Sequence, residues 1–141
     1  MGVTLTGDIF NLYVFFEIMC ISSYALVAFR RKWQSIEAGI KYMIVSSLGT
    51  SFILLGVAFL YGQVGSLNIA DLMQKLGGVA SSTLIVPITL FVTGFGIKIA
   101  IVPLHMWQPD AYQAAPSAVA ALFYGATATV GIYEKIRVVY M

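Results

Sequence analysis

The chain has 141 residues, of which 60% are hydrophobic and 10% are charged, and its formal net charge is +2. Soluble domains carry about 25% charged residues, so this composition excludes an ordinary soluble globule and indicates an integral membrane protein. The small net charge, without a basic patch of interleaved aromatic residues, argues against nucleic-acid binding. A single cysteine, Cys20, excludes an internal disulfide and metal-type cysteine spacings.

The hydropathy pattern predicts about four membrane-spanning helices, because each needs about 20 apolar residues. We place these spans at about residues 3–29, 36–61, 81–102 and 114–138. The sequence shows no internal repeat and no linker. The prediction is therefore one all-α transmembrane bundle over residues 1–141, with its third span broken near Pro103-Pro109.

The first predicted span has one charge in its interior, Glu17. Tyr13, Glu17, Cys20 and Tyr24 recur at helical spacing and give a narrow polar stripe on an otherwise apolar helix. The basic cluster Arg30-Arg31-Lys32 follows. By the positive-inside rule this loop is cytoplasmic, and with four spans both chain ends then lie outside.

Small residues enrich the second predicted span, and such residues let neighbouring helices approach closely. They are Ser46, Ser47, Gly49, Thr50, Ser51 and Gly56. Glu37 and Lys41, four residues apart near the start of this span, are expected to form an interfacial ion pair. After the span we expect a loop that contains a short amphipathic helix at about residues 67–76.

The third predicted span carries Lys98 deep in an apolar run and then meets two prolines. A lysine in the bilayer centre is unfavourable by about 2.5 to 3.5 kcal/mol on insertion scales, so it normally faces protein or water. The break at Pro103-Pro109 frees backbone groups, which persist in a membrane only when buried in protein or lining a wet cavity. His105, inside the break, is placed either to exchange protons with the cytoplasm or to satisfy a freed carbonyl group.

The fourth predicted span has Pro116 near its first turn, a favourable position for proline. Four of its residues fall near one face: Tyr124, Thr127, Gly131 and Glu134. We expect Glu134, like Asp8, to lie near a span end and to reach water. Asp110 precedes this span, and helix capping or loop bonding is its expected role.

Glu17 and Lys98 are the two charges farthest from any predicted span end. On neighbouring helices, opposite charges about 4 Å apart are worth roughly 4 kcal/mol at an effective dielectric constant near 20. Such a pair can act as a proton carrier, which must both hold and release a proton, or as a static ion pair that fixes helix packing. The residues alone leave both roles open. No hydrolase, phosphate-loop or metal motif accompanies them.

Two ordered stretches resemble the proton-conducting antiporter-like family. That family includes Mrp-type sodium/proton antiporter subunits, the antiporter-like subunits of respiratory complex I, and their counterparts in membrane-bound hydrogenases. Asp8–Met19, followed by Ser22–Leu26, is similar to the family's glutamate-bearing fifth helix. Gly94–Lys98, running through Pro103–Ala111 to Ala115–Ser117, is similar to the broken seventh helix and the start of the eighth.

The resemblance implies that Glu17 and Lys98 are the family's interacting intramembrane pair, with Lys98 as the protonatable lysine at the helix break. His105 matches the family's loop histidine. Two positions depart from the pattern. Thr129 stands where the eighth helix usually has a lysine or histidine that passes protons onward, and Tyr112 stands where a second loop histidine often appears. The family's fuller members also have a second, inverted half, so this chain resembles the core of one half.

The predicted function is that of a small antiporter-like subunit of an energy-converting complex in the plasma membrane. It would take part in, or relay, proton or sodium translocation without a catalytic site, cofactor or metal of its own. Its predicted partners are the other membrane subunits of a hydrogenase-like, complex I-like or Mrp-like complex, together with lipid. A non-conducting structural or coupling subunit is the alternative. The candidate ion-path residues are Glu17, Lys98 and His105, and secondarily Thr129, Tyr13 and Asp110.

Overall fold

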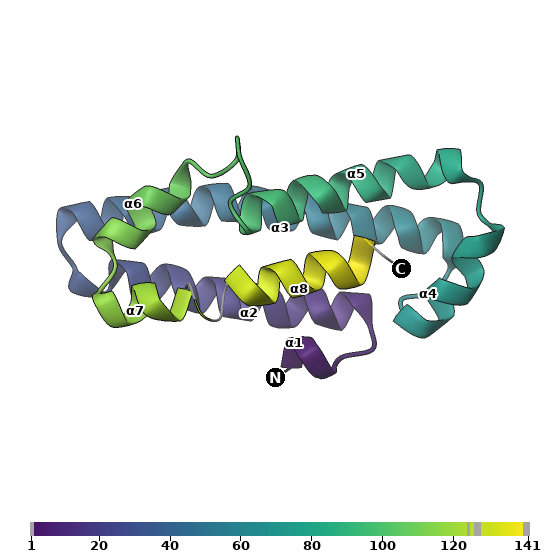
Figure 1. The fold of residues 1–141 in the computed structure, drawn as a ribbon, viewed down its shortest axis with the longest axis horizontal. Coiled ribbons are helices and arrows are strands. Elements are labelled where there is room, and N and C mark those ends of the chain that lie inside the picture. The colour runs from purple at the N-terminus through teal and green to yellow at the C-terminus, as the bar shows by residue number, and fades with distance from the viewer. Residues whose placement is uncertain (1, 124, 126–127, 140–141) are drawn as a thin grey trace.

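The computed structural model describes residues 2–123, 125 and 128–139, and it shows a bundle of helices (Figure 1). Within these residues there is no β-strand. The elements in chain order are α1 (Gly2–Leu5), α2 (Ile9–Val27), η1 (Ala28–Arg30), α3 (Trp33–Val64), α4 (Ile69–Lys75), η2 (Leu76–Gly78), α5 (Ser81–Lys98), α6 (Trp107–Ala114), α7 (Ser117–Leu122) and α8 (Ala128–Val139). The predicted positions of Tyr124 and Thr127 lie outside the described residues.

The first spanning helix begins at Ile9, so the expected start near residue 3 was wrong. Asp8 is the N-cap of α2, and its side chain accepts a hydrogen bond from the backbone N–H of Asn11 at 2.8 Å. The backbone N–H of Ile9 also donates to the carbonyl of Leu67 at 2.9 Å. The chain is thereby tied to the loop before α4, and α1 is a separate short helix.

The second spanning helix, α3, covers the predicted span of 36–61 and extends past it at both ends. It ends at Gly65, whose φ of 70° places it in the left-handed region that favours glycine. The predicted short helix in the following loop is confirmed as α4. Asn68 caps α4 by accepting from the backbone N–H of Ala70 at 3.0 Å.

The third spanning helix, α5, ends at Lys98, earlier than the expected end near residue 102. The backbone N–H of Ile101 donates to the carbonyl of Gly96 at 2.9 Å, and that of Ala100 donates to Ile97 at 3.3 Å. These two bonds form a Schellman motif, with Ala100 in the left-handed conformation at φ 54°. Two of the last carbonyl groups of α5 are therefore hydrogen-bonded where the helix ends.

The predicted break is confirmed, but it lies earlier than Pro109. Residues 99–106 are irregular, whereas Pro109 lies in the first turn of α6, where a missing N–H does no harm. Trp107, the first residue of α6, donates its indole N–H to the carbonyl of Ile97 at 2.9 Å. This contact joins the two sides of the break.

Within the fourth predicted span the structure describes α7 and α8, and residues 124, 126 and 127 between them lie outside the described residues. Among the described residues, three helical stretches are long and apolar enough to cross a membrane, namely Ile9–Arg30, Trp33–Val64 and Ser81–Lys98. With α7 and α8, they make an all-α membrane protein of about four transmembrane helices. Pro116 lies at the N-cap of α7, just before its first residue.

Helix α3 is the centre of the bundle and packs against α2, α5 and α6. It runs beside α5 in Figure 1, and Gly49 faces Gly94 where the two helices touch. A Cβ atom added at Gly94 would lie 2.7 Å from the carbonyl oxygen of Gly49 and 2.7 Å from Cγ1 of Ile53. The small residues of the second span therefore allow the close approach that the sequence predicted.

Replacing Gly94 by alanine should destabilise the bundle, because the new methyl group meets backbone that cannot move aside. We expect Gly94→Ala to lower the free energy of unfolding by about 1 to 3 kcal/mol. Gly62→Ala is the matched control: that glycine also lies in a helix but has open space around it, and alanine should stabilise it by about 0.5 to 1 kcal/mol. Unfolding by denaturing detergent, followed by circular dichroism, measures both effects. Equal stability of the two variants would contradict the close contact.

Candidate functional site

Lys98 is the centre of the buried polar site. It is the last residue of α5, and only 9% of it is exposed. Its Nζ donates to Ser46 Oγ at 2.6 Å, to Cys20 Sγ at 3.3 Å and to Tyr24 Oη at 3.4 Å. The three N–H donors of the ammonium group are thus matched by three neutral acceptors, from α2 and α3.

The sequence places these acceptors through helical spacing. Phe16, Cys20 and Tyr24 are four residues apart and share one face of α2. The ring of Phe16 adds a cation–π contact, with Lys98 Nζ 5.4 Å from its centroid. The hydroxyl of Tyr24 donates to Ser46 Oγ at 2.8 Å, so the acceptors also hold one another in place. The Cys20 and Tyr24 part of the predicted polar stripe therefore faces Lys98.

Glu17 does not form the expected direct ion pair with Lys98. No Lys98–Glu17 contact occurs within the 4.0 Å that defines an ion pair, and Glu17 Oε2 is buried without a hydrogen-bond partner in the described chain. Lys98 instead uses the neutral groups of α2 and α3. Glu17 lies on α2 one helical turn before Cys20, which accepts a hydrogen bond from Lys98 at 3.3 Å. The carboxylate is therefore on the helix that helps to hold Lys98, without an ion pair between the two charges.

His105 lies in the break between α5 and α6, as predicted, and is partly buried. Its Nδ1 is buried and has no hydrogen-bond partner among the described residues. The freed carbonyl of Ile97 accepts from Trp107 rather than from His105. His105 is also not among the three hydrogen-bond partners of Lys98. The structure thus places it beside the break and outside the contacts of Lys98.

A small cavity of about 20 Å³ adjoins Lys98 on the side of the break. Tyr42 and Trp107 line it and stack on each other, with ring centroids 4.3 Å apart and an interplanar angle of 8°. Tyr112, the residue at the position of the family's second loop histidine, lines it too. Its volume is about that needed by one water molecule.

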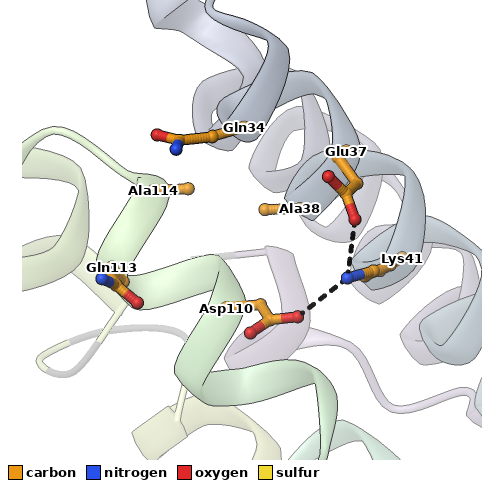
Figure 2. Close-up of a pocket in the computed structure, with 7 residues that line it drawn as sticks. All are labelled: Gln34, Glu37, Ala38, Lys41, Asp110, Gln113 and Ala114. Carbon is orange, nitrogen blue, oxygen red and sulfur yellow. Dashed lines mark hydrogen bonds and ion pairs between the residues drawn. The ribbon is translucent and has the colours of Figure 1, made fainter.

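Asp110 belongs to a second, exposed polar site, shown in Figure 2. Lys41 Nζ lies 2.9 Å from the carboxylate of Glu37 and 3.3 Å from that of Asp110, beside a cleft of about 260 Å³. The expected Glu37–Lys41 pair is confirmed. Exposed ion pairs contribute little to stability, so Asp110 links α6 only weakly to α3, and it does not cap a helix.

The other two secondary candidates do not contact Lys98. Tyr13 is partly buried one turn before Glu17, with its ring centroid 6.1 Å from that of Phe10. Thr129 is exposed, and its hydroxyl donates to the carbonyl of Gly125 at 3.1 Å. Thr129 is therefore bonded to a backbone carbonyl four residues before it and is not among the hydrogen-bond partners of Lys98.

Glu134 is the residue that sequence reasoning placed wrongly. We expected it to reach water, but it is 0% exposed, and neither of its carboxyl oxygens has a hydrogen-bond partner among the described residues. Its helix, α8, packs on α5, the helix that ends at Lys98. The sequence signal that could have indicated this burial is the helical face that Glu134 shares with Gly131. A Cβ atom added at Gly131 would lie 2.6 Å from Ile99 Cγ2, so this face packs on the end of α5.

Comparison with known proteins agrees with this geometry. Residues 6–141 match the family described as NADH:quinone oxidoreductase/Mrp antiporter, TM. The chain is 43% identical to NADH-quinone oxidoreductase subunit N of Desulforudis audaxviator, over 99% of this chain and 28% of that protein. It is 38% identical to a Na(+)/H(+) antiporter subunit of Alkalihalophilus pseudofirmus, over 96% of this chain and 28% of that protein.

A solved structure shows the same fold. A chain of the membrane-bound sulfane sulfur reductase, an archaeal respiratory membrane complex, superposes with a TM-score of 0.94 at 40% identity, over 99% of this chain and 28% of that one. The chain thus spans little more than a quarter of the length of these relatives. Because the family match covers nearly the whole sequence and the fold agrees, this all-α membrane chain belongs to the NADH:quinone oxidoreductase/Mrp antiporter family.

Proposed function

We propose that this chain forms the ion-path core of an antiporter-like subunit, in which Lys98 holds and releases a translocated proton. One observation carries the proposal: a buried lysine is solvated by three neutral protein groups and has no carboxylate within ion-pair distance in the described chain. Intramembrane lysines are rare because they are unfavourable, and they commonly mark ion pathways.

Neutral partners suit a proton carrier better than a direct ion pair does. A carboxylate in contact stabilises the ammonium form and opposes release of the proton. Hydroxyl groups can either accept or donate, so Ser46 and Tyr24 can satisfy Lys98 both as ammonium and as amine. The site can therefore hold both protonation states without leaving a buried group unpaired.

Glu17 then acts on Lys98 through space. Opposite charges that do not touch still attract each other in the bundle interior, by an amount that falls with their separation. Protonating or deprotonating Glu17 would therefore change how firmly Lys98 holds its proton. The cavity beside Lys98 and the break that contains His105 supply the side from which a proton would arrive or leave.

The names of the relatives indicate the setting. They belong to an NADH-quinone oxidoreductase, a Na(+)/H(+) antiporter and a respiratory membrane complex. We therefore assign the chain to the plasma membrane, as part of a multisubunit complex whose redox or antiport chemistry drives the movement of protons or sodium ions.

Charge-removing variants test the carrier role in proteoliposomes of the intact complex. We expect Lys98→Ala to abolish ion translocation while the complex still assembles. Glu17→Gln should slow translocation about tenfold, because it removes a carboxylate one helical turn before Cys20, which accepts a hydrogen bond from Lys98. The control is Asp71→Asn, which changes an exposed carboxylate paired with Lys75 on α4 and should leave the rate unchanged. Normal translocation by both site variants would instead identify a non-conducting structural subunit.

The neutral acceptors can be tested with two adjacent serines. Ser46→Ala removes the shortest hydrogen bond of Lys98, and a bond to a charged group is worth about 1.5 to 3 kcal/mol, so translocation should slow about tenfold or more. Ser47→Ala is the matched control, since Ser47 is exposed on the same helix. Flux in proteoliposomes measures both. Equal rates for the two variants would show that Ser46 does not support the carrier.

A further inference from the structure

We propose that Glu134 is a second protonatable group of the Lys98 site and exchanges a proton with Lys98. This inference rests on the proposed function of Lys98 and extends it along α8. It assigns a role to a carboxyl group that the resemblance to the family did not single out.

The burial of Glu134 is the first observation. The residue is 0% exposed, and both carboxyl oxygens lack a hydrogen-bond partner in the described chain. A buried, unpartnered carboxylate is strongly disfavoured and tends to take up a proton. Carboxyl groups inside membrane proteins are uncommon for the same reason, and they mark proton relays. Glu134 is therefore a group whose protonation state depends on its surroundings.

The packing of α8 on α5 is the second observation. Gly131 lies against Ile99 at the end of α5, and Val138 shares an apolar pocket with Phe91, further back along α5. The two helices therefore run in opposite directions, and Glu134 lies between those two levels. This position brings it alongside the end of α5 that carries Lys98.

The charges around Glu134 come from several helices. Lys98 ends α5, the helix on which α8 packs, and Glu17 lies on α2. On α8 itself, Lys135 is the next residue, and Arg137 is directed elsewhere, with its guanidinium donating to the carbonyl of Thr6 at 2.6 Å. Lys98 is thus the basic group best placed to exchange a proton with Glu134.

The proposed exchange is a balanced proton transfer. An N–H bond breaks at Lys98 Nζ and an O–H bond forms at a carboxyl oxygen of Glu134. Lys98 changes from ammonium to amine, Glu134 changes from carboxylate to neutral acid, and no electron moves. The long side chain of Lys98 has four rotatable bonds, so its head can swing from Ser46 towards α8 before the transfer.

This exchange would restore a step that Thr129 cannot perform. A threonine hydroxyl carries no charge, and that of Thr129 is exposed and donates to the carbonyl of Gly125, outside the hydrogen bonds of Lys98. Glu134 follows Thr129 on α8 by more than one helical turn and points into the bundle. The protonatable group of α8 is therefore displaced along the helix and has the opposite charge type.

The test uses the intact complex in proteoliposomes and five variants measured together, of which one is the Lys98→Ala variant described above. We expect Glu134→Gln and Glu134→Leu to lower proton translocation about 100-fold, the typical contribution of a positioned proton-transfer group, and Glu134→Asp to retain part of the rate. Infrared difference spectra between high and low pH should lose a protonated-carboxyl band in Glu134→Gln. Asp71→Asn, an exposed carboxylate on α4, should change neither readout.

Each outcome decides between roles. Leucine fills a similar volume and needs no polar partner, so a merely structural Glu134 would tolerate it. Normal translocation by Glu134→Leu, or by Glu134→Gln with an unchanged infrared spectrum, would overturn this inference alone if Lys98→Ala is inactive. If Lys98→Ala also translocates normally, the proposed function itself fails. Should Glu134→Gln not assemble, Glu134→Leu supplies the rate and Glu134→Asp supplies the infrared band.

Discussion

The solvation of one ammonium group by neutral protein groups is the constraint on which this bundle depends. Away from water, Lys98 requires acceptors at fixed places, and these come from two other helices, through Cys20 on α2 and Ser46 on α3. The contact between Gly49 and Gly94 sets the required distance. Gly49 is one turn from Ser46, and Gly94 is one turn from Lys98, so the close helix approach brings the serine within 2.6 Å of the lysine.

The C-terminus of α5 also stabilises the ammonium group of Lys98. A cation at a helix C-terminus faces the negative end of the helix dipole, which contributes about 0.3 to 1 kcal/mol at exposed sites. The helix ends at Lys98 because Ala100 adopts a left-handed conformation. This conformation is unfavourable by about 1 to 2 kcal/mol for residues other than glycine. The bond from Trp107 to the carbonyl of Ile97 offsets part of this strain. The break after α5 therefore helps to position the charge of Lys98.

Sequence patterns predicted the membrane helices, the break after Lys98 and the face of α2 that carries Cys20. Periodicity shows which residues share a face, but it does not show which helix that face meets. Ser46 was consequently interpreted as a packing residue, although it makes the shortest hydrogen bond to Lys98. Glu134 was expected to reach water because its distance from the predicted span end was counted along the chain. Its burial depends on how α8 lies along α5, which only tertiary packing determines.

The separation of Lys98 from both neighbouring carboxyl groups gives the site its chemical character. In a low-dielectric interior, a carboxylate in contact with a lysine strongly stabilises the ammonium form, so the proton stays on the lysine. Here neither Glu17 on α2 nor Glu134 on α8 forms an ion pair with Lys98 among the described residues. Interactions between charges that do not touch fall gradually with distance, so they bias the protonation of a lysine without fixing it in one state. The neutral groups that contact Lys98 therefore determine where the ammonium group rests, and the two carboxyl groups can only modulate it.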